Sequence, residues 1–382
     1  MVDRVTSSRT ATRYLTQSIP GWPSRSGDDG FVVGVLPGEG IGPEVVDAAL
    51  LVLEAVTQAR RLPFDIRRAA GPAGSGRQRS WLKGEGVAFC DEIFSAGGAL
   101  FCGPLGGRSV YDLRARFDLY CKLVPLRPNP VLADVAIVRP ERLTDVDVLI
   151  VRENLGGVYA GEFGRRDGGR IAYQTFAYHA DQVERIVQVA ARLAVTRRGL
   201  LTVTGKAGGV PEVSALWREM AESVASEHGL VADFLEIDNA SYQLIADPRR
   251  FDVVLAPNFL GDILADSATV LLGSRGMSYS ANYGPNGRAA YQTGHGAAYD
   301  LTDLDRANPV AQILSAALML HESFELSDEA RCIETAVDNV LAAGRRTADV
   351  AGPGSDVLGT RQLAECIAEE AAELASETRK IA

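Results

Sequence analysis

Two aspartates four residues apart, Asp262 and Asp266, have the type and spacing that most directly suggest chemistry. They follow an apolar run at residues 251–255 that predicts a buried strand, and residues 260–272 carry apolar side chains at helical spacing. Both carboxylates then lie on one face of a helix, where they repel each other unless a cation binds between them. A divalent ion that prefers oxygen ligands suits this position. The same spacing also fits two solvated aspartates that stabilise the start of a helix.

Reactive side chains also follow other apolar runs. Tyr159, Lys206 and Asp238 come shortly after segments that predict strands, and His295 and Asp300 share a loop of small residues. Each has a plain structural explanation: a core tyrosine, a capping lysine or a turn histidine bonded to the backbone. Ligands of open α/β sheets, however, bind at the carboxyl ends of the strands. The joint occurrence of these residues at several strand ends therefore predicts a ligand site.

A glycine-rich turn follows the first predicted strand, at residues 31–36. Residues 37–44 read PGEGIGPE, and a helix is predicted from Pro43, whose missing N–H costs nothing in the first helical turn, to about Arg61. Strand, turn and helix are similar to a dinucleotide-binding fingerprint. The glycines have the spacing G-x-G-x-G instead, and no acidic residue follows a second strand at the usual distance. The turn alone therefore leaves phosphate binding open.

The rest of the chain alternates short apolar segments with amphipathic ones, which is typical of an α/β protein with a largely parallel sheet. Further strands are predicted at residues 99–102, 146–151 and 200–203, and helices at residues 183–196, 213–227, 309–324, 328–343 and 359–377. A length of 382 residues suggests about two domains. Residues 1–30 are polar, lack the apolar core of a secretory signal and are predicted to form a flexible or surface-lying extension.

Composition narrows the classes of function. A net charge of −10 and a pI near 5.1 argue against nucleic acid and against an anionic membrane surface as partners. No apolar run reaches the roughly 18 residues that span a bilayer. The five cysteines lack C-x-x-C spacing, which indicates reduced thiols in a cytoplasmic protein and neither a zinc site nor a disulfide framework.

Several long motifs, in order along the chain, carry a resemblance to a known family. They are LPGEGIGPEV at residues 36–45, NFLGDILAD at 258–266, and ANP at 307–309 followed by ILSAA at 313–317. From about residue 31 to 365 the chain resembles the β-decarboxylating dehydrogenases, which act on 3-isopropylmalate, isocitrate, homoisocitrate, or tartrate and malate. The segments at 156–162 and 212–219 are most similar to those of isopropylmalate dehydrogenases.

The resemblance implies an isocitrate/isopropylmalate dehydrogenase-like α/β fold, with two domains around a mixed sheet and the active site in the cleft between them. Residues 31–123 and 272–382 would form the cofactor-binding domain. Residues 124–271 would form the domain that binds substrate and metal and makes the dimer. Residues 1–30 would remain outside both domains.

The implied reaction is the NAD-dependent oxidation of a 2-hydroxy acid that carries a carboxylate on C3, followed by loss of CO2. Asp262, Asp266 and the partner subunit's Asp238 would bind Mg²⁺ or Mn²⁺. Lys206, also from the partner subunit, would take the hydroxyl proton with a pKa lowered by burial and by the metal, and Tyr159 would protonate the enol carbon. The implied assembly is a homodimer, or a higher even-numbered oligomer, with shared active sites.

Substrate and cofactor residues follow from the same resemblance. Arg114 and Arg152 would hold carboxylates, for which forked donors are suited. The adenosine part of the cofactor would lie against a loop and its flank, formed by His295, Gly296, Ala297, Asp300 and Asn308. An acid at Asp300 would accept from the ribose hydroxyls and repel a 2′-phosphate, so NAD is expected rather than NADP.

The chain departs from the family at several positions. Relatives carry a second substrate arginine where this chain has Val124, and Arg127 could replace it only if the loop held three extra residues. Gly208 stands near the place of an asparagine that contacts the nicotinamide end in relatives. The glutamate before His295 is replaced by Gln292.

The residues that precede Arg114 are expected to select the distal group of the substrate. They are Arg108, Val110 and Tyr111, and they match neither the isocitrate nor the isopropylmalate pattern. Val110 could accept an alkyl group, whereas Arg108 could meet a carboxylate or a phosphonate. An isopropylmalate-like substrate is favoured, and the alternatives are a substrate with an anionic distal group, tartrate or D-malate. A catalytically silent regulatory subunit is disfavoured because the lysine, the tyrosine and the three aspartates are all present.

Overall fold

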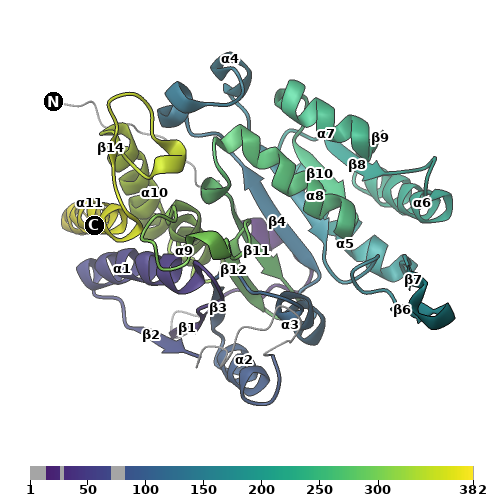
Figure 1. Ribbon diagram of the computed structural model, residues 1–382, viewed down its shortest axis with the longest axis horizontal. Coiled ribbons are helices and arrows are strands. Elements are labelled where there is room, and N and C mark those ends of the chain that lie inside the picture. The colour runs from purple at the N-terminus through teal and green to yellow at the C-terminus, as the bar shows by residue number, and fades with distance from the viewer. Residues whose placement is uncertain (1–13, 26–29, 70–81, 382) are drawn as a thin grey trace.

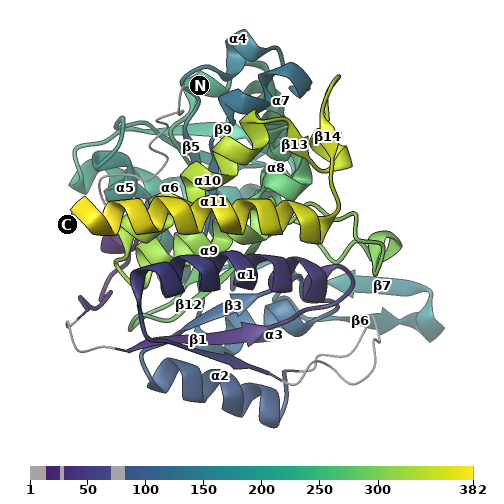
Figure 2. The same ribbon diagram turned by 90° about the vertical axis from the view of Figure 1, so that its left-hand side faces the viewer.

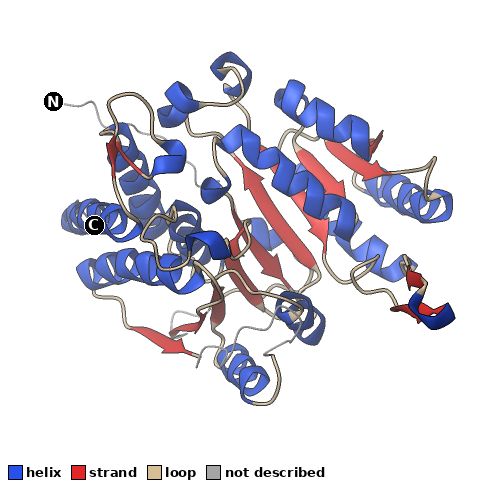
Figure 3. Ribbon diagram, in the orientation of Figure 1, coloured by secondary structure: helices blue, strands red, loops and turns tan. Residues whose placement is uncertain are grey.

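The computed structural model describes residues 14–25, 30–69 and 82–381 and contains a central sheet of ten strands (Figures 1 and 3). Its order is β2-β1-β3-β12-β11-β4-β5-β10-β8-β9. The strands are β1 Phe31–Leu36, β2 Phe64–Arg68, β3 Ala99–Cys102, β4 Cys121–Leu126, β5 Val148–Glu153, β8 Leu201–Gly205, β9 Ala232–Glu236, β10 Val253–Ala256, β11 Tyr279–Tyr283 and β12 Ala289–Thr293. Two small sheets pair β6 Phe163–Arg166 with β7 Ile171–Gln174, and β13 Arg345–Arg346 with β14 Asp356–Val357.

The sheet is mixed, as the family resemblance implies. Strand β11 runs antiparallel to β12 and β4, and β4 runs antiparallel to β5, while the other neighbours are parallel. All residues of β3, β4, β5 and β10 are buried, because helices cover both faces of this part of the sheet. The α/β fold expected from the sequence is thus confirmed.

Eleven α-helices are present in the described part of the chain. They are α1 Gly42–Arg60, α2 Glu85–Ser95, α3 Ser109–Phe117, α4 Pro140–Leu143, α5 Ala180–Val195, α6 Pro211–Glu227, α7 Ile237–Ala246, α8 Asn258–Ala268, α9 Val310–Glu322, α10 Ser327–Ala342 and α11 Thr360–Ile381. Helix α9 is buried all round, which fits its apolar sequence. It contacts β11, β12, α1 and α10, and α11 runs alongside α1 (Figure 2).

One hydrophobic core connects the two halves of the sheet. It includes Val35 of β1 and Val254 of β10, near opposite ends of the strand order. The boundary expected between residues 123 and 124 falls inside β4, which is paired on both sides. The division into a cofactor-binding part and a substrate-binding part therefore remains a proposal about function.

Residues 15–19 pack more deeply than the flexible or surface-lying extension predicted for residues 1–30. A short turn, Leu15–Ser18, is buried against α9, and Glu322 at the end of α9 holds it there. The Glu322 carboxylate accepts hydrogen bonds from the Leu15 N–H at 3.0 Å, the Thr16 N–H at 2.9 Å and the Thr16 hydroxyl at 3.0 Å. This segment belongs to the packed core, while residues 1–13 and 26–29 lie outside the described residues.

The burial of Glu322 makes stability depend on pH. Burial raises the pKa of Glu322 to about 7, although the hydrogen bonds from Thr16 and Leu15 oppose the rise. The unfolded carboxyl titrates near about 4.3, so the folded protein binds more protons between these two values. The free energy of unfolding is therefore expected to fall by roughly 3 kcal/mol as pH rises through this window and to level off above it. Denaturant titrations at pH 5 and pH 8 measure the change.

Glu322→Gln is expected to remove most of this pH dependence, because the amide does not titrate. It also loses acceptors for the Leu15–Thr16 turn, so its stability should be below that of the wild type at pH 5. The exposed Glu325, three residues further on, supplies the matched control Glu325→Gln. An unchanged pH dependence in Glu322→Gln would show that this carboxyl is not the group that titrates.

The structure also describes the state of the cysteines and the apolar character of the helices. In the described residues all five cysteines are free thiols, and four of them are buried. No helix in those residues combines the length and the apolar character needed to cross a bilayer.

Candidate functional site

Asp262 lies at the centre of the site and accepts bonds from two other elements. Strand β10 ends at Ala256 and α8 begins at Asn258, so the carboxylate stands at the carboxyl end of the sheet. Its Oδ2 accepts from the Tyr159 hydroxyl at 2.7 Å, and its Oδ1 pairs with the Arg152 guanidinium. Burial alone would raise the pKa of Asp262, but Arg152 and then Tyr159 lower it below the usual value. The carboxylate is thus held ionised.

The Arg152 side chain packs closely against α8 at Gly261. A Cβ at Gly261 would lie 2.9 Å from the Ala256 Cβ and 3.1 Å from the Arg152 Cγ, so this close approach requires glycine. Arg152 also donates from Nε and Nη2 to the Asn258 Oδ1, at 3.1 and 2.8 Å. Asn258 therefore fixes the guanidinium, a role that the sequence motif contains but that was not predicted for this residue.

Tyr159 is held in its protonated form. Burial, followed by the hydrogen bond to Asp262, raises the pKa of Tyr159 above its usual value. Its ring packs against Tyr111, with centroids 5.0 Å apart, and edge-on to Phe259 at 5.6 Å. The phenol therefore keeps its proton and donates it in the hydrogen bond to Asp262.

Two further basic side chains, Arg114 and Lys122, lie near Asp262. Arg114 on α3 is 4% exposed, and burial and then Arg152 lower its pKa to about 9. Its Nε is buried without a hydrogen-bond partner among the described residues. Lys122 on β4 is 5% exposed, and burial, Arg114 and Arg152 lower its pKa well below the usual value. Lys122 was not among the predicted site residues.

The other residues expected to contact substrate separate into two groups. Arg108 and Tyr111 belong to the site: the Arg108 guanidinium lies 5.4 Å from the Tyr111 ring and 5.7 Å from the ring of Phe163 on β6. Val110 follows in the first turn of α3 and is half-buried. Arg127 is not brought to the site, since it lies beyond the end of β4 and pairs with Asp147 at 2.9 Å.

The loop expected to hold the cofactor packs against the glycine-rich turn. The Ile41 N–H donates to the Ala297 carbonyl at 2.9 Å, and the Tyr299 hydroxyl donates to Glu39 at 2.6 Å. A Cβ at Gly40 would lie 2.0 Å from the Ala297 oxygen, so this contact requires glycine. The turn therefore shapes the loop.

The individual side chains of this loop differ in exposure. His295 contacts the Gly296 carbonyl at 3.0 Å through Nδ1, and burial lowers its pKa. A Cβ at Gly296 would meet nothing within 4 Å, and Asp300 is exposed. Asn308 is buried and engaged: it donates to Asp349 at 3.0 Å and accepts from the Val310 N–H at 3.0 Å. Asn308 thus stabilises the start of α9.

Lys206 and Asp238 lie together but apart from Asp262. The Lys206 ammonium is 2.7 Å from Asp238 and 3.4 Å from Glu236, and the side chains of Lys206 and Asp238 are 41% and 69% exposed. The hydrogen bond to Asp238 raises the pKa of Lys206, so the lowered value expected from the sequence is not found in the single chain. Within the described residues no three acidic, histidine or cysteine side chains gather into a metal site. Asp238 is therefore not brought together with Asp262 and Asp266 in the single chain as the structure describes it.

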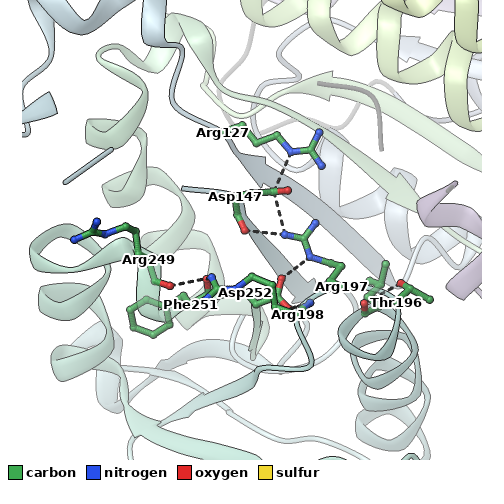
Figure 4. Close-up of polar contacts among 9 residues, drawn as sticks. Arg127, Asp147, Thr196, Arg197, Arg198, Arg249, Phe251 and Asp252 are labelled. Atoms are coloured by element: carbon green, nitrogen blue, oxygen red, sulfur yellow. Dashed lines mark hydrogen bonds and ion pairs between the residues drawn. The ribbon is translucent and has the colours of Figure 1, made fainter. Parts of the chain in front are cut away.

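A separate cavity lies between the end of β4 and the loops beside α5. It has a volume of about 1280 Å³, and ion pairs cross its wall (Figure 4). Asp147 pairs with Arg127 at 2.9 Å and with Arg197 at 3.0 Å, and Arg197 pairs with Asp252 at 2.7 Å. These charges satisfy one another, whereas at the site around Asp262 no ion pair engages Arg114 or Lys122 among the described residues.

Comparisons with known proteins agree with this geometry. A sequence model of the family described as isocitrate/isopropylmalate dehydrogenase matches residues 32–367. A 3-isopropylmalate dehydrogenase of Gloeobacter violaceus is 38% identical, over 88% of this chain and 96% of its own, and one of Sodalis glossinidius is 40% identical, over 88% and 97%. The crystal structure of isocitrate dehydrogenase from Methylococcus capsulatus superposes with a TM-score of 0.78 at 31% identity, covering 90% of this chain and 99% of that one.

Proposed function

This chain belongs to the isocitrate/isopropylmalate dehydrogenase family, and from that premise we propose the substrate, cofactor and residue roles of its reaction. It is a decarboxylating dehydrogenase that acts on a CH–OH donor. The substrate we propose is a 2-hydroxy acid with a carboxylate on C3, similar to 3-isopropylmalate, and the cofactor is NAD. The observation that carries this proposal is the convergence of Asp262, Tyr159 and the buried cations Arg114 and Arg152 at one strand end.

The donor set suits a hard divalent cation. Asp262 and Asp266 stand four apart on α8, and each already accepts a cationic side chain: Arg152 for the first and Arg275, at 2.5 Å, for the second. With the partner subunit's Asp238 they would offer only carboxylate oxygens, which Mg²⁺ and Mn²⁺ prefer. Such an ion would act as a Lewis acid on the hydroxyl and carbonyl oxygens.

The basic side chains and Tyr159 would bind the substrate and transfer its protons. Arg114 and Arg152 bind the two carboxylates and orient the C2–H bond, because paired N–H donors fix a planar anion. Lys206 of the partner subunit would take the hydroxyl proton, and bound NAD would supply the hydride acceptor. When the bond from C3 to its carboxylate breaks and CO2 leaves, the electron pair remains on C3, and the Tyr159 hydroxyl supplies the proton that C3 then needs.

The exposed Asp300 is proposed to favour NAD over NADP. Asp300→Asn is expected to lower kcat/KM for NAD roughly 10-fold, because a charged hydrogen bond to the ribose weakens, and to reduce the discrimination against NADP. Asp303→Asn is the matched control, since Asp303 is also exposed and lies three residues further on. Initial rates with each cofactor measure the ratio, and an unchanged ratio would remove Asp300 from the cofactor site.

The assembly we propose is a homodimer with shared sites, in the cytoplasm. It is supported by the exposure of Lys206 and Asp238, which one chain leaves without a catalytic centre, and by large exposed apolar side chains on the β6–β7 hairpin. Phe163 and Ile171 are 62% and 52% exposed there. The free cysteines favour a reducing compartment. The acidic net charge favours a small molecule, rather than nucleic acid or an anionic membrane, as the partner.

A panel of substrates tests the proposal. NADH formation is measured with Mn²⁺ on 3-isopropylmalate, isocitrate, homoisocitrate, D-malate, tartrate and a phosphonomethyl-malate. Fast turnover of 3-isopropylmalate is the expected result. Turnover of only the substrates with an anionic distal group would support the second candidate, which Arg108 favours because its guanidinium contacts aromatic rings and no carboxylate among the described residues. No turnover at all would support a silent subunit.

A further inference from the structure

Lys122 occupies a position in the sheet that directs its side chain into the site. In β4 it is paired directly with Arg152 of β5 on one side and with Asn282 of β11 on the other. Side chains of directly paired residues extend from the same face of a sheet. Arg152 extends to Asp262 and Asn258, so Lys122 lies on the face from which Arg152 enters the site.

The ammonium group of Lys122 lacks a partner among the residues that the structure describes. Lys122 is 5% exposed, and no hydrogen bond or ion pair joins its side chain to any of them. The neighbouring amide of Asn282 is already used, since its Oδ1 accepts from Asn154 at 2.9 Å and its Nδ2 donates to the Ala290 carbonyl at 3.2 Å. A buried cation without a counter-ion is costly, which indicates that an anion from outside the chain completes its environment.

The local balance of charge supports the same conclusion. Lys122, Arg114 and Arg152 are three buried cations, and the carboxylates that act on Lys122 are Asp262 and Asp266. Of these two, Asp262 is bound to Arg152, and Asp266 is bound to Arg275. Among the described residues Arg114 and Lys122 are therefore left without a bound carboxylate. Burial and then Arg152 lower the pKa of Arg114, while burial, Arg114 and Arg152 lower that of Lys122.

We propose that Lys122, together with Arg114, binds a carboxylate of the substrate's malate core, that is, the hydroxyl-bearing part with two carboxylates that all candidate substrates share. This inference rests on the proposed function. It identifies Lys122 as the residue that supplies a positive charge, in addition to that of Arg114, to this carboxylate. Val124 and Leu126, further along β4 on the same face, are both apolar. Lys122 is therefore the charged side chain that β4 presents on this face.

Arg127, the substitute considered from the sequence, cannot perform this task. It is five residues from Lys122, about 17 Å along an extended strand. An odd separation also directs its side chain to the opposite face of the sheet. Its guanidinium is held by Asp147 at 2.9 Å in the wall of the other cavity (Figure 4).

Two neutral variants, Lys122→Met and Lys122→Gln, test the inference. With saturating NAD and Mn²⁺, KM for D-malate and for the best substrate of the panel is expected to rise roughly 10- to 100-fold in both variants, the value of one charged hydrogen bond. The change in kcat should be small, because the carboxylate is bound in the ground state as well as the transition state. The exposed Lys83 provides the matched control Lys83→Met, for which KM stays unchanged.

Binding without turnover provides a second readout. D-malate with Mn²⁺ is expected to raise the thermal midpoint of the wild type and of Lys83→Met, and to raise it much less in the Lys122 variants. Removing a buried unpaired charge should leave the variants folded, and Lys122→Gln serves if Lys122→Met does not fold.

The outcomes separate the two proposals. A KM for D-malate within about twofold of wild type, with an unchanged thermal shift, would overturn the role of Lys122. A KM that rises only for substrates with an anionic distal group would move Lys122 from the malate core to the distal group and so also contradict the inference. Absence of turnover in the wild type would refute the proposed function, while the thermal shift would still decide whether Lys122 binds the anion.

Discussion

Asp262→Asn is expected to lower kcat by roughly 10³-fold or more, because the amide removes the charge on which both the divalent ion and the Arg152 guanidinium depend. The asparagine keeps the size of the side chain and can still accept from Tyr159, so steric change contributes little. Two measurements check this expectation: the rate of NADH formation on the best substrate, and the affinity for Mn²⁺ in a direct titration. Both should fall together.

The buried ion pair makes a stability control necessary for Asp262→Asn. Removing the carboxylate leaves Arg152 buried with only Asn258 as an acceptor, a change that costs about 3–5 kcal/mol when one partner of a buried pair is lost. Activity is therefore compared at a temperature where the circular dichroism of the variant matches that of the wild type. Asp181→Asn, at an exposed aspartate in the first turn of α5, is the matched control. A folded Asp262→Asn variant with near-normal turnover would contradict the metal assignment.

The sequence predicted the parts of the site that are local. Residues 251–266 place a strand, a break and a helix in direct succession, and the structure has β10 ending at Ala256 and α8 beginning at Asn258. The predicted helix extends too far, however, since α8 ends at Ala268 and continues as a 3₁₀ turn. The position of Tyr159 beside Asp262 also follows, because β5 and β10 are neighbours whose carboxyl ends meet at one edge.

Positions that depend on strand register could not be predicted. Lys122 and Arg127 are both basic residues in one segment, and only the pairing of β4 with β5 and β11 determines that the first faces Arg152. The packing of residues 15–18 depends on Glu322, more than three hundred residues away in the sequence. Such contacts are set by tertiary structure, and neither periodicity nor local propensity contains them.

In the single chain Lys206 and Asp238 are not arranged for the proposed proton transfer. Their side chains bond to each other at 2.7 Å on an exposed surface, and this bond raises the pKa of Lys206, which opposes a role as proton acceptor. A proton acceptor needs a lowered pKa, and in the proposed dimer burial against the neighbouring subunit, with a divalent ion competing for Asp238, would provide it. If the sites are shared in this way, a chain that lacks Lys206 and a chain that lacks Asp262 have complementary defects.

Mixing two inactive variants is therefore expected to restore activity. Lys206→Met and Asp262→Asn each lack turnover alone, but a dimer with one chain of each has one site with both residues intact and one with neither. Random exchange of subunits gives about a quarter of the wild-type activity, since half of the dimers are mixed and each has one working site. The variants are unfolded and refolded together, and NADH formation is compared with that of each variant refolded alone. Mixed dimers without activity would show that each chain completes its own site, and a fully active monomer at high dilution would lead to the same conclusion.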